Sequence, residues 1–204
     1  MFTGGKWKFQ TNGRVSSSPA VENGLVYVGS MDQNLYAVDQ QTGALTWKFA
    51  TEDPVVSSPA LAGGIVYFAS YDGKFYALDA ATGQLKWKFE TAGERRDAGR
   101  HLHGLLRAAE TMPDPWDYFL SSPAVWNGAV YCGSGDGNVY ALDAVSGSLK
   151  WKLKTGDDAE IHNHVGIQSS PAVTDGTVYF GCRGSNVYAV DAKSCPQSRI
   201  PMGP

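Results

Sequence analysis

The sequence predicts an all-β fold, a β-propeller of four four-stranded antiparallel blades. The first observation is a tetrapeptide, Ser-Ser-Pro-Ala, that opens four successive repeats at Ser17–Ala20, Ser57–Ala60, Ser121–Ala124 and Ser169–Ala172. The second is the pair of short runs of β-branched and aromatic residues that follows each copy, as in Leu25–Gly29 and Leu35–Asp39. Such runs, separated by Gly and Asp, are typical of strands joined by turns.

The repeat length distinguishes a propeller from other repeat architectures. The interval from Pro19 to Pro59 is 40 residues, and so is the interval from Trp47 to Trp87. The pair Asp72-Gly73 lies between two expected strands, where a tight hairpin turn requires positive φ. Four short strands in about 40 residues make one blade, and no helical solenoid has this pattern.

The segment Tyr76–Phe89 (Tyr-Ala-Leu-Asp-Ala-Ala-Thr-Gly-Gln-Leu-Lys-Trp-Lys-Phe) resembles the tryptophan-docking repeat of the PQQ-like propeller family. The resemblance implies that Trp47, Trp87 and Trp151 dock between neighbouring blades. The family includes quinone-dependent alcohol dehydrogenases, an outer-membrane assembly lipoprotein and sensor domains of bacterial kinases. The resemblance therefore implies a fold and leaves the activity open.

The residues argue against a quinone cofactor. Quinone dehydrogenases of this family are much longer and commonly carry a disulfide between adjacent cysteines, whereas Cys132, Cys182 and Cys195 are far apart. Their calcium-binding residues have no obvious counterpart here, and Asp32, Asp72 and Asp136 are expected to be hairpin-turn residues. We therefore expect no PQQ and interpret Cys132 and Cys182 as buried free thiols.

Composition excludes several classes of partner. The net charge is −3 and no basic run with interleaved aromatic residues occurs, so a nucleic-acid partner is not expected. No apolar stretch is long enough to span a membrane, and the first residues do not form a signal peptide. As given, the chain is expected to be soluble and cytoplasmic, although bacterial members of the family are often periplasmic or secreted.

The whole chain, 1–204, is expected to form one propeller domain with two insertions between blades, at about 90–120 and 155–168. The interval between successive prolines grows to 64 residues from Pro59 to Pro123 and to 48 residues from Pro123 to Pro171. Long loops without a repeat role are more often functional than idle. We expect both at one face, near the mouth of the central channel.

All four histidines of the chain lie in these insertions, as the pairs His101-Leu102-His103 and His162-Asn163-His164. In an extended segment the side chains at positions i and i+2 point to the same side, so each pair can bind a divalent metal such as zinc or manganese. Possible accessory carboxylates are Asp97, Asp157, Asp158 and Glu160. Two alternatives stay open: the histidines are incidental in polar loops, or a helix beginning before His101 separates the first pair.

Two functions from different classes follow. A four-histidine metal site suits a metal-dependent hydrolase of phosphoester or ester substrates, because a bound metal acidifies water. In that case Trp116, Asp117 and Tyr118 would line the substrate pocket, although packing of the loop explains them equally well. The alternative is a non-catalytic propeller that binds a protein partner or serves as a scaffold.

The first and last repeats predict a homodimer. The sequence Trp7-Lys8-Phe9 matches a closing strand without a blade of its own, whereas Cys195 and Arg199 stand where the last repeat needs Gly and Trp. We expect two copies to close one eight-bladed ring, with the docking pocket of Trp7 on the other subunit. The alternative is a monomeric four-bladed ring closed by Trp7 within one chain.

Overall fold

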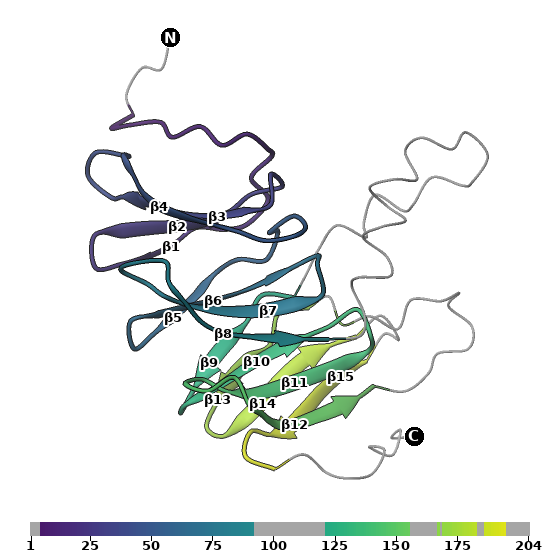
Figure 1. Cartoon of the computed structure of the whole chain (residues 1–204). Coiled ribbons are helices and arrows are strands. Elements are labelled where there is room, and N and C mark those ends of the chain that lie inside the picture. Colours follow the sequence, from purple (N-terminus) through teal and green to yellow (C-terminus); the bar gives the residue numbers. More distant parts are fainter. Residues whose placement is uncertain (1–4, 92–120, 156–166, 168, 183–185, 195–204) are drawn as a thin grey trace, which may run out of the picture.

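Each repeat folds into its own antiparallel sheet, and the four sheets follow one another in chain order (Figure 1). The computed structural model describes residues 5–91, 121–155, 167, 169–182 and 186–194, and these contain strands and no helix. The first sheet consists of β1 (Ala20–Glu22), β2 (Leu25–Gly29), β3 (Asn34–Asp39) and β4 (Leu45–Ala50). Its strands pair in sequence order, which is the topology of a propeller blade.

The second and third sheets repeat this plan. The second consists of β5 (Ala60–Ala62), β6 (Ile65–Ser70), β7 (Lys74–Asp79) and β8 (Leu85–Glu90). The third consists of β9 (Ala124–Trp126), β10 (Ala129–Gly133), β11 (Asn138–Asp143) and β12 (Leu149–Lys154). The short first strands of neighbouring sheets, β1 with β5 and β5 with β9, contact one another, so they form the inner edge of the stack.

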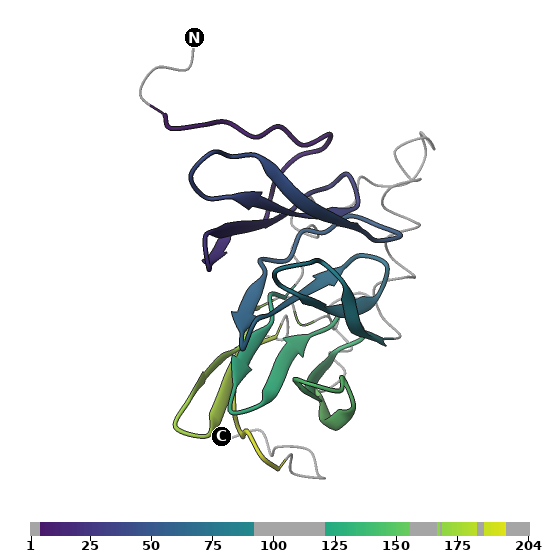
Figure 2. The same ribbon diagram turned by 60° about the vertical axis from the view of Figure 1, so that its left-hand side comes forward.

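The fourth sheet has three strands within the described part of the chain: β13 (Ala172–Thr174), β14 (Thr177–Gly181) and β15 (Val187–Asp191). The all-β propeller class predicted from the repeats is confirmed, with these sheets as blades one to four. Blade one and blade four lie at opposite ends of the stack in both views (Figures 1 and 2). No described strand pair joins the N-terminal segment to β15, so the described part of the chain is an open arc and not a closed four-bladed ring.

The tryptophans connect one blade to the next, as the resemblance implied. The indole Nε1 of Trp87, on β8, donates to the carbonyl oxygen of Ala144 in blade three at 3.0 Å. The hydroxyl of Tyr67 donates to the same carbonyl at 3.1 Å. The equivalent pairs are Trp47 with Tyr27 on Ala80, and Trp151 with Tyr131 on Ala192. Each junction is thus sealed by one carbonyl that accepts two buried donors.

A glycine in the next blade makes room for the docked indoles of Trp47 and Trp87, whereas Cys195 stands at the corresponding position for Trp151 and lies outside the described residues. A Cβ added to Gly147 would lie 2.6 Å from Cδ2 of Trp87, and its φ of +72° is one that L residues rarely adopt. Gly83 has the same relation to Trp47. The Thr-Gly and Ser-Gly pairs of the repeat are therefore required by the docking as well as by the turn.

The N-terminal segment docks in the same way on its own chain, which corrects the expectation that its pocket belongs to another subunit. Nε1 of Trp7 donates to the carbonyl oxygen of Gln40 in blade one at 2.9 Å, and the indole lies against Gly43. The ring of Phe9 packs edge-on against Tyr36 at 5.4 Å between centroids. The expectation was wrong because a closing strand sends its tryptophan into the following blade, and for Trp7 the following blade is blade one of the same chain.

The prediction that Cys132 and Cys182 are both buried is only partly confirmed. Cys132 is buried in β10 and forms no disulfide among the described residues, as expected. Cys182 is half-buried and follows β14, where the other blades have Ser30, Ser70 and Ser134, so it is not the equivalent of Cys132. Cys195 lies outside the described residues.

Candidate functional site

Both insertions leave their blades at the same end of the fold. Thr91 precedes the first insertion, and its backbone N–H donates to the carbonyl oxygen of Gly73 at 2.8 Å. Thr155 precedes the second, and its N–H donates to Gly137 at 3.0 Å. Gly73 and Gly137 occupy equivalent turns between the second and third strands of adjacent blades. The two insertions are therefore rooted beside equivalent turns on neighbouring blades.

The connection between blades one and two has no insertion, and it shows which contacts a short connection makes with the preceding blade. Val55 is fully buried, and its N–H donates to the carbonyl oxygen of Ser30 at 3.0 Å. Ile167, at the return of the second insertion, repeats both features with Ser134 at 2.9 Å. The ends of this insertion therefore keep the contacts of an ordinary connection.

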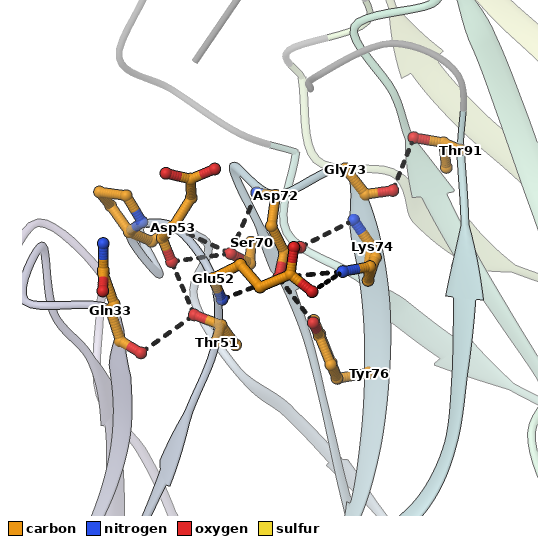
Figure 3. Close-up of polar contacts among 11 residues, drawn as sticks. Gln33, Thr51, Glu52, Asp53, Ser70, Asp72, Gly73, Lys74, Tyr76 and Thr91 are labelled. Carbon is orange, nitrogen blue, oxygen red and sulfur yellow. Dashed lines mark hydrogen bonds and ion pairs between the residues drawn. The ribbon is translucent and has the colours of Figure 1, made fainter. Parts of the chain in front are cut away.

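A turn aspartate lies at the root of each described connection. Asp72 is fully buried, and its carboxylate accepts from the hydroxyl of Tyr76 at 2.6 Å and from the N–H groups of Lys74 and Glu52 at 3.0 and 3.2 Å (Figure 3). It thus ties the turn to the connection that passes over it. Asp32 does the same for Asn34, Tyr36 and Asn12. The predicted turn role of these aspartates is confirmed.

Blade two adds a buried cation to this arrangement. Nζ of Lys74 lies 2.6 Å from Oε1 of Glu52 and 3.9 Å from Oδ2 of Asp72, and the lysine side chain is only 5% exposed (Figure 3). Asparagines Asn34, Asn138 and Asn186 occupy the equivalent position in the other blades. Sequence reasoning missed this ion cluster, although a lysine in place of a repeated asparagine was a visible signal.

The pKa shifts of the turn aspartate Asp32 and its hydrogen-bond partner Tyr36 indicate a structural role and not a role in proton transfer. Burial opposes ionisation of Asp32, but hydrogen bonds from Tyr36 and Asn34 hold the pKa of its carboxyl below the usual value. Burial, together with the hydrogen bond to Asp32, raises the pKa of Tyr36 to about 12. Both groups therefore keep one protonation state across neutral pH, whereas a general acid or base needs a pKa near the operating pH.

Comparison with known proteins identifies the family to which this four-blade fold belongs. The family model described as the outer membrane protein assembly factor BamB matches residues 4–111 and 116–196. The chain belongs to this PQQ-like propeller family. Its Trp-docking junctions and four-stranded blades are the structural form of that membership. No curated protein sequence matches the chain significantly.

Solved structures with the same fold come from proteins of different kinds. BamB from Moraxella catarrhalis superposes with a TM-score of 0.71 at 18% identity, over 94% of this chain and 51% of that one. A quinohemoprotein alcohol dehydrogenase of Pseudomonas putida HK5 gives 0.65 at 22% identity, over 93% and 34%. The computationally designed protein Ika4 gives 0.62 at 17% identity, over 89% and 93%. The chain thus spans about half the length of the BamB structure, and these likenesses concern the fold.

The predicted metal and pocket residues of this BamB-family chain lie outside the described residues. They are the ligands His101, His103, His162 and His164, the carboxylates Asp97, Asp157, Asp158 and Glu160, and the pocket residues Trp116, Asp117 and Tyr118. Among the residues that the structure does describe, no three His, Cys, Asp or Glu side chains are grouped as metal ligands. The same part of the chain holds no helix long and apolar enough to cross a membrane.

Proposed function

We propose that the chain is a non-catalytic, protein-binding propeller module. The observation that carries this is the outer face of blade four. Val187 is 82% exposed and Tyr179 is 41% exposed, whereas their equivalents in blade one, Leu35 and Tyr27, are 0% and 1% exposed because blade two covers them. An apolar sheet face of this kind, beside a strand that is paired on only one side among the described strands, is typical of a protein interface. The family description, an assembly factor, supports the same function.

Affinity purification from the native cells tests this function when the unmodified chain is compared with a variant at Val187. Val187→Asp should remove the bound protein, because it places a charge in the interface. Val145→Asp is the matched control, since Val145 is 76% exposed and lies in the turn between β11 and β12 of blade three. Loss of the same protein with Val187→Asp and its retention with Val145→Asp is the expected result. A set of bound proteins that is identical for both variants would contradict the proposal.

A metal-dependent hydrolase remains the second candidate, supported by the common root of the two insertions at Gly73 and Gly137. That geometry brings the bases of both histidine-bearing segments to adjacent blades. His101 and His103 would then share a zinc or manganese ion with His162 and His164. The substrate would be a small phosphoester or carboxyl ester.

Metal analysis separates the two candidates. If the site is shared, His101→Ala and His162→Ala should each lower metal affinity and any esterase or phosphodiesterase activity by about tenfold or more, as loss of a ligand does. Asn163→Ala serves as the control because it keeps both pairs. Bound metal would be measured by elemental analysis after dialysis against zinc or manganese. Metal content well below one ion per chain in the unmodified protein would eliminate this candidate.

A further inference from the structure

We propose that the protein bound by blade four is a second copy of this chain, whose segment Lys6–Gln10 adds the fourth strand beside β15. This inference rests on the proposed function, because it names the partner of the same face. It follows from four features of the two ends of the arc, each of which has an occupied counterpart at the internal junctions.

The segment Lys6–Gln10 makes the side-chain contacts of a closing strand. Trp7 and Phe9 make the contacts that Trp47 and Phe49 make one repeat later, Trp7 with the carbonyl of Gln40 and Phe9 with the ring of Tyr36. The N–H of Asn12 donates to Asp32 at 2.8 Å, as Glu52 does to Asp72. Yet this segment pairs with no described strand of its own chain. In the proposed pair, blade four of the second copy supplies the strand partner for this segment.

Blade four offers the edge that such a strand needs. In blades one to three the third strand pairs with a fourth, as β3 does with β4, whereas β15 pairs only with β14 among the described strands. Ala189 on β15 is exposed, although its equivalents Ala37 and Ala141 are fully buried. Adding a strand and a blade to this side would bury the same positions that are buried elsewhere.

At two internal junctions, the side chain that precedes one blade packs over a glycine of the blade before it. The glycine of blade four and the valine before blade one lack this contact with each other. A Cβ built on Gly29 would lie 2.6 Å from Cγ1 of Val55, and one built on Gly133 would lie 2.5 Å from Cγ2 of Ile167. At Gly181, the equivalent of these glycines, the nearest atom is 3.6 Å away and belongs to its own blade, to Ser169. Val15, the equivalent of Val55 and Ile167, is 46% exposed. Val15 of one copy fits over Gly181 of the other.

A series of hydrogen bonds from backbone N–H groups to serine hydroxyls follows the inner edge and, among the described residues, ends beside blade one and blade four. The backbone N–H of Ser18 donates to Oγ of Ser58, and that of Ser58 donates to Oγ of Ser122, both at 2.9 Å. The N–H of Ser122 donates to Oγ of Ser170 at 3.0 Å. The next step would join the N–H of Ser170, which precedes blade four, to Oγ of Ser18, which precedes blade one. These two blades lie at opposite ends of the stack (Figure 2), so the proposal places this step between two copies.

Blades one to three also specify how the added segment should align with β15, because their third and fourth strands all pair in the same register. Tyr36 pairs with Lys48, Tyr76 with Lys88 and Tyr140 with Lys152. The same alignment places Tyr188 opposite Lys8 of the second copy and Ala189 opposite its Trp7. A two-fold pair forms this junction twice and leaves no open end, so assembly stops at two chains.

Light scattering behind a sizing column, with purified protein at micromolar concentration, tests the proposal. The unmodified chain should have twice the 21.9 kDa mass of one chain. Val187→Asp and Val15→Asp, which change opposite sides of the junction, should each give the mass of one chain, and Val145→Asp should stay dimeric. All three positions are exposed in the single chain, so circular dichroism should show that the variants keep their fold.

A mass of one chain for the unmodified protein would overturn the proposal, and so would a dimer that survives both junction variants. A mass well above two chains would also overturn it, since it would indicate an open filament instead of a closed ring. These outcomes are distinct from failure of the proposed function. If the purified chain is monomeric but a different protein is retained through Val187, the binding function stands and only the second copy is wrong.

Discussion

Replacing Trp87 with alanine is expected to lower the free energy of unfolding by about 3–5 kcal/mol. The side chain is only 8% exposed, and its Nε1 donates to the buried carbonyl of Ala144. Its removal leaves a cavity between blades two and three and takes one of two donors from that carbonyl. Urea unfolding followed by circular dichroism measures the change.

Two variants separate the contributions at this junction. Trp87→Phe keeps a ring but loses the N–H donor, so it should cost less than Trp87→Ala. Gly147→Ala forces a methyl group against the docked indole, whereas Gly128→Ala has a nearly equal φ of +73° and no atom within 4 Å. The first should therefore be more destabilising than the second by about 1–3 kcal/mol. Equal effects of the two glycine variants would mean that the docking contact is not tight.

The second large effect is expected at the buried ion cluster of blade two. Asp72→Ala should lower the free energy of unfolding by about 3–5 kcal/mol, because it leaves Lys74 buried with one carboxylate fewer and removes the acceptor for Tyr76 and Glu52. Adding Lys74→Met to Asp72→Ala should cost less than the sum of the single changes, since the buried charge disappears with its partner.

Glu52 provides the control for that cluster. Its side chain is 59% exposed, so Glu52→Gln removes a charge that water already screens and should cost about 1 kcal/mol or less. A loss as large as that of Asp72→Ala would show that the outer carboxylate, and not the buried one, holds Lys74.

The blades were predictable because their pattern is local and repeated. Strands, hairpin turns and docking tryptophans recur at fixed offsets, and each structural role depends on one residue type, such as Gly147 beneath Trp87. The burial of Lys74 was not predictable in this way. It depends on Glu52, which arrives from the connection of the previous blade and covers an ammonium group that the repeat pattern assigns to a polar turn.

The placement of Trp7 shows a second limit of repeat counting. Periodicity identified it correctly as part of a closing strand. Two separate contacts define such a strand, however: its backbone pairs with one blade and its indole docks on the next. The expectation merged the two, and only the geometry at Gln40 and Gly43 separated them.

The repeat pattern does not predict how the two histidine pairs are arranged. His101 and His162 lie in segments that repeat nothing, so no equivalent strand elsewhere in the chain fixes which way their side chains point. The sequence identifies the residue types that bind metal, whereas their convergence depends on loop conformations that no period describes.

The shared acceptor at each junction has a consequence for how such a protein grows in evolution. Each of the first three units carries both halves of the joint: a tryptophan and a tyrosine for the following unit, and an alanine or glutamine carbonyl above a glycine for the preceding one. Unequal crossing-over that inserts or deletes one whole unit of the gene therefore creates no unmatched joint. Selection can lengthen, shorten or fuse these arrays while the chemistry between neighbours stays the same.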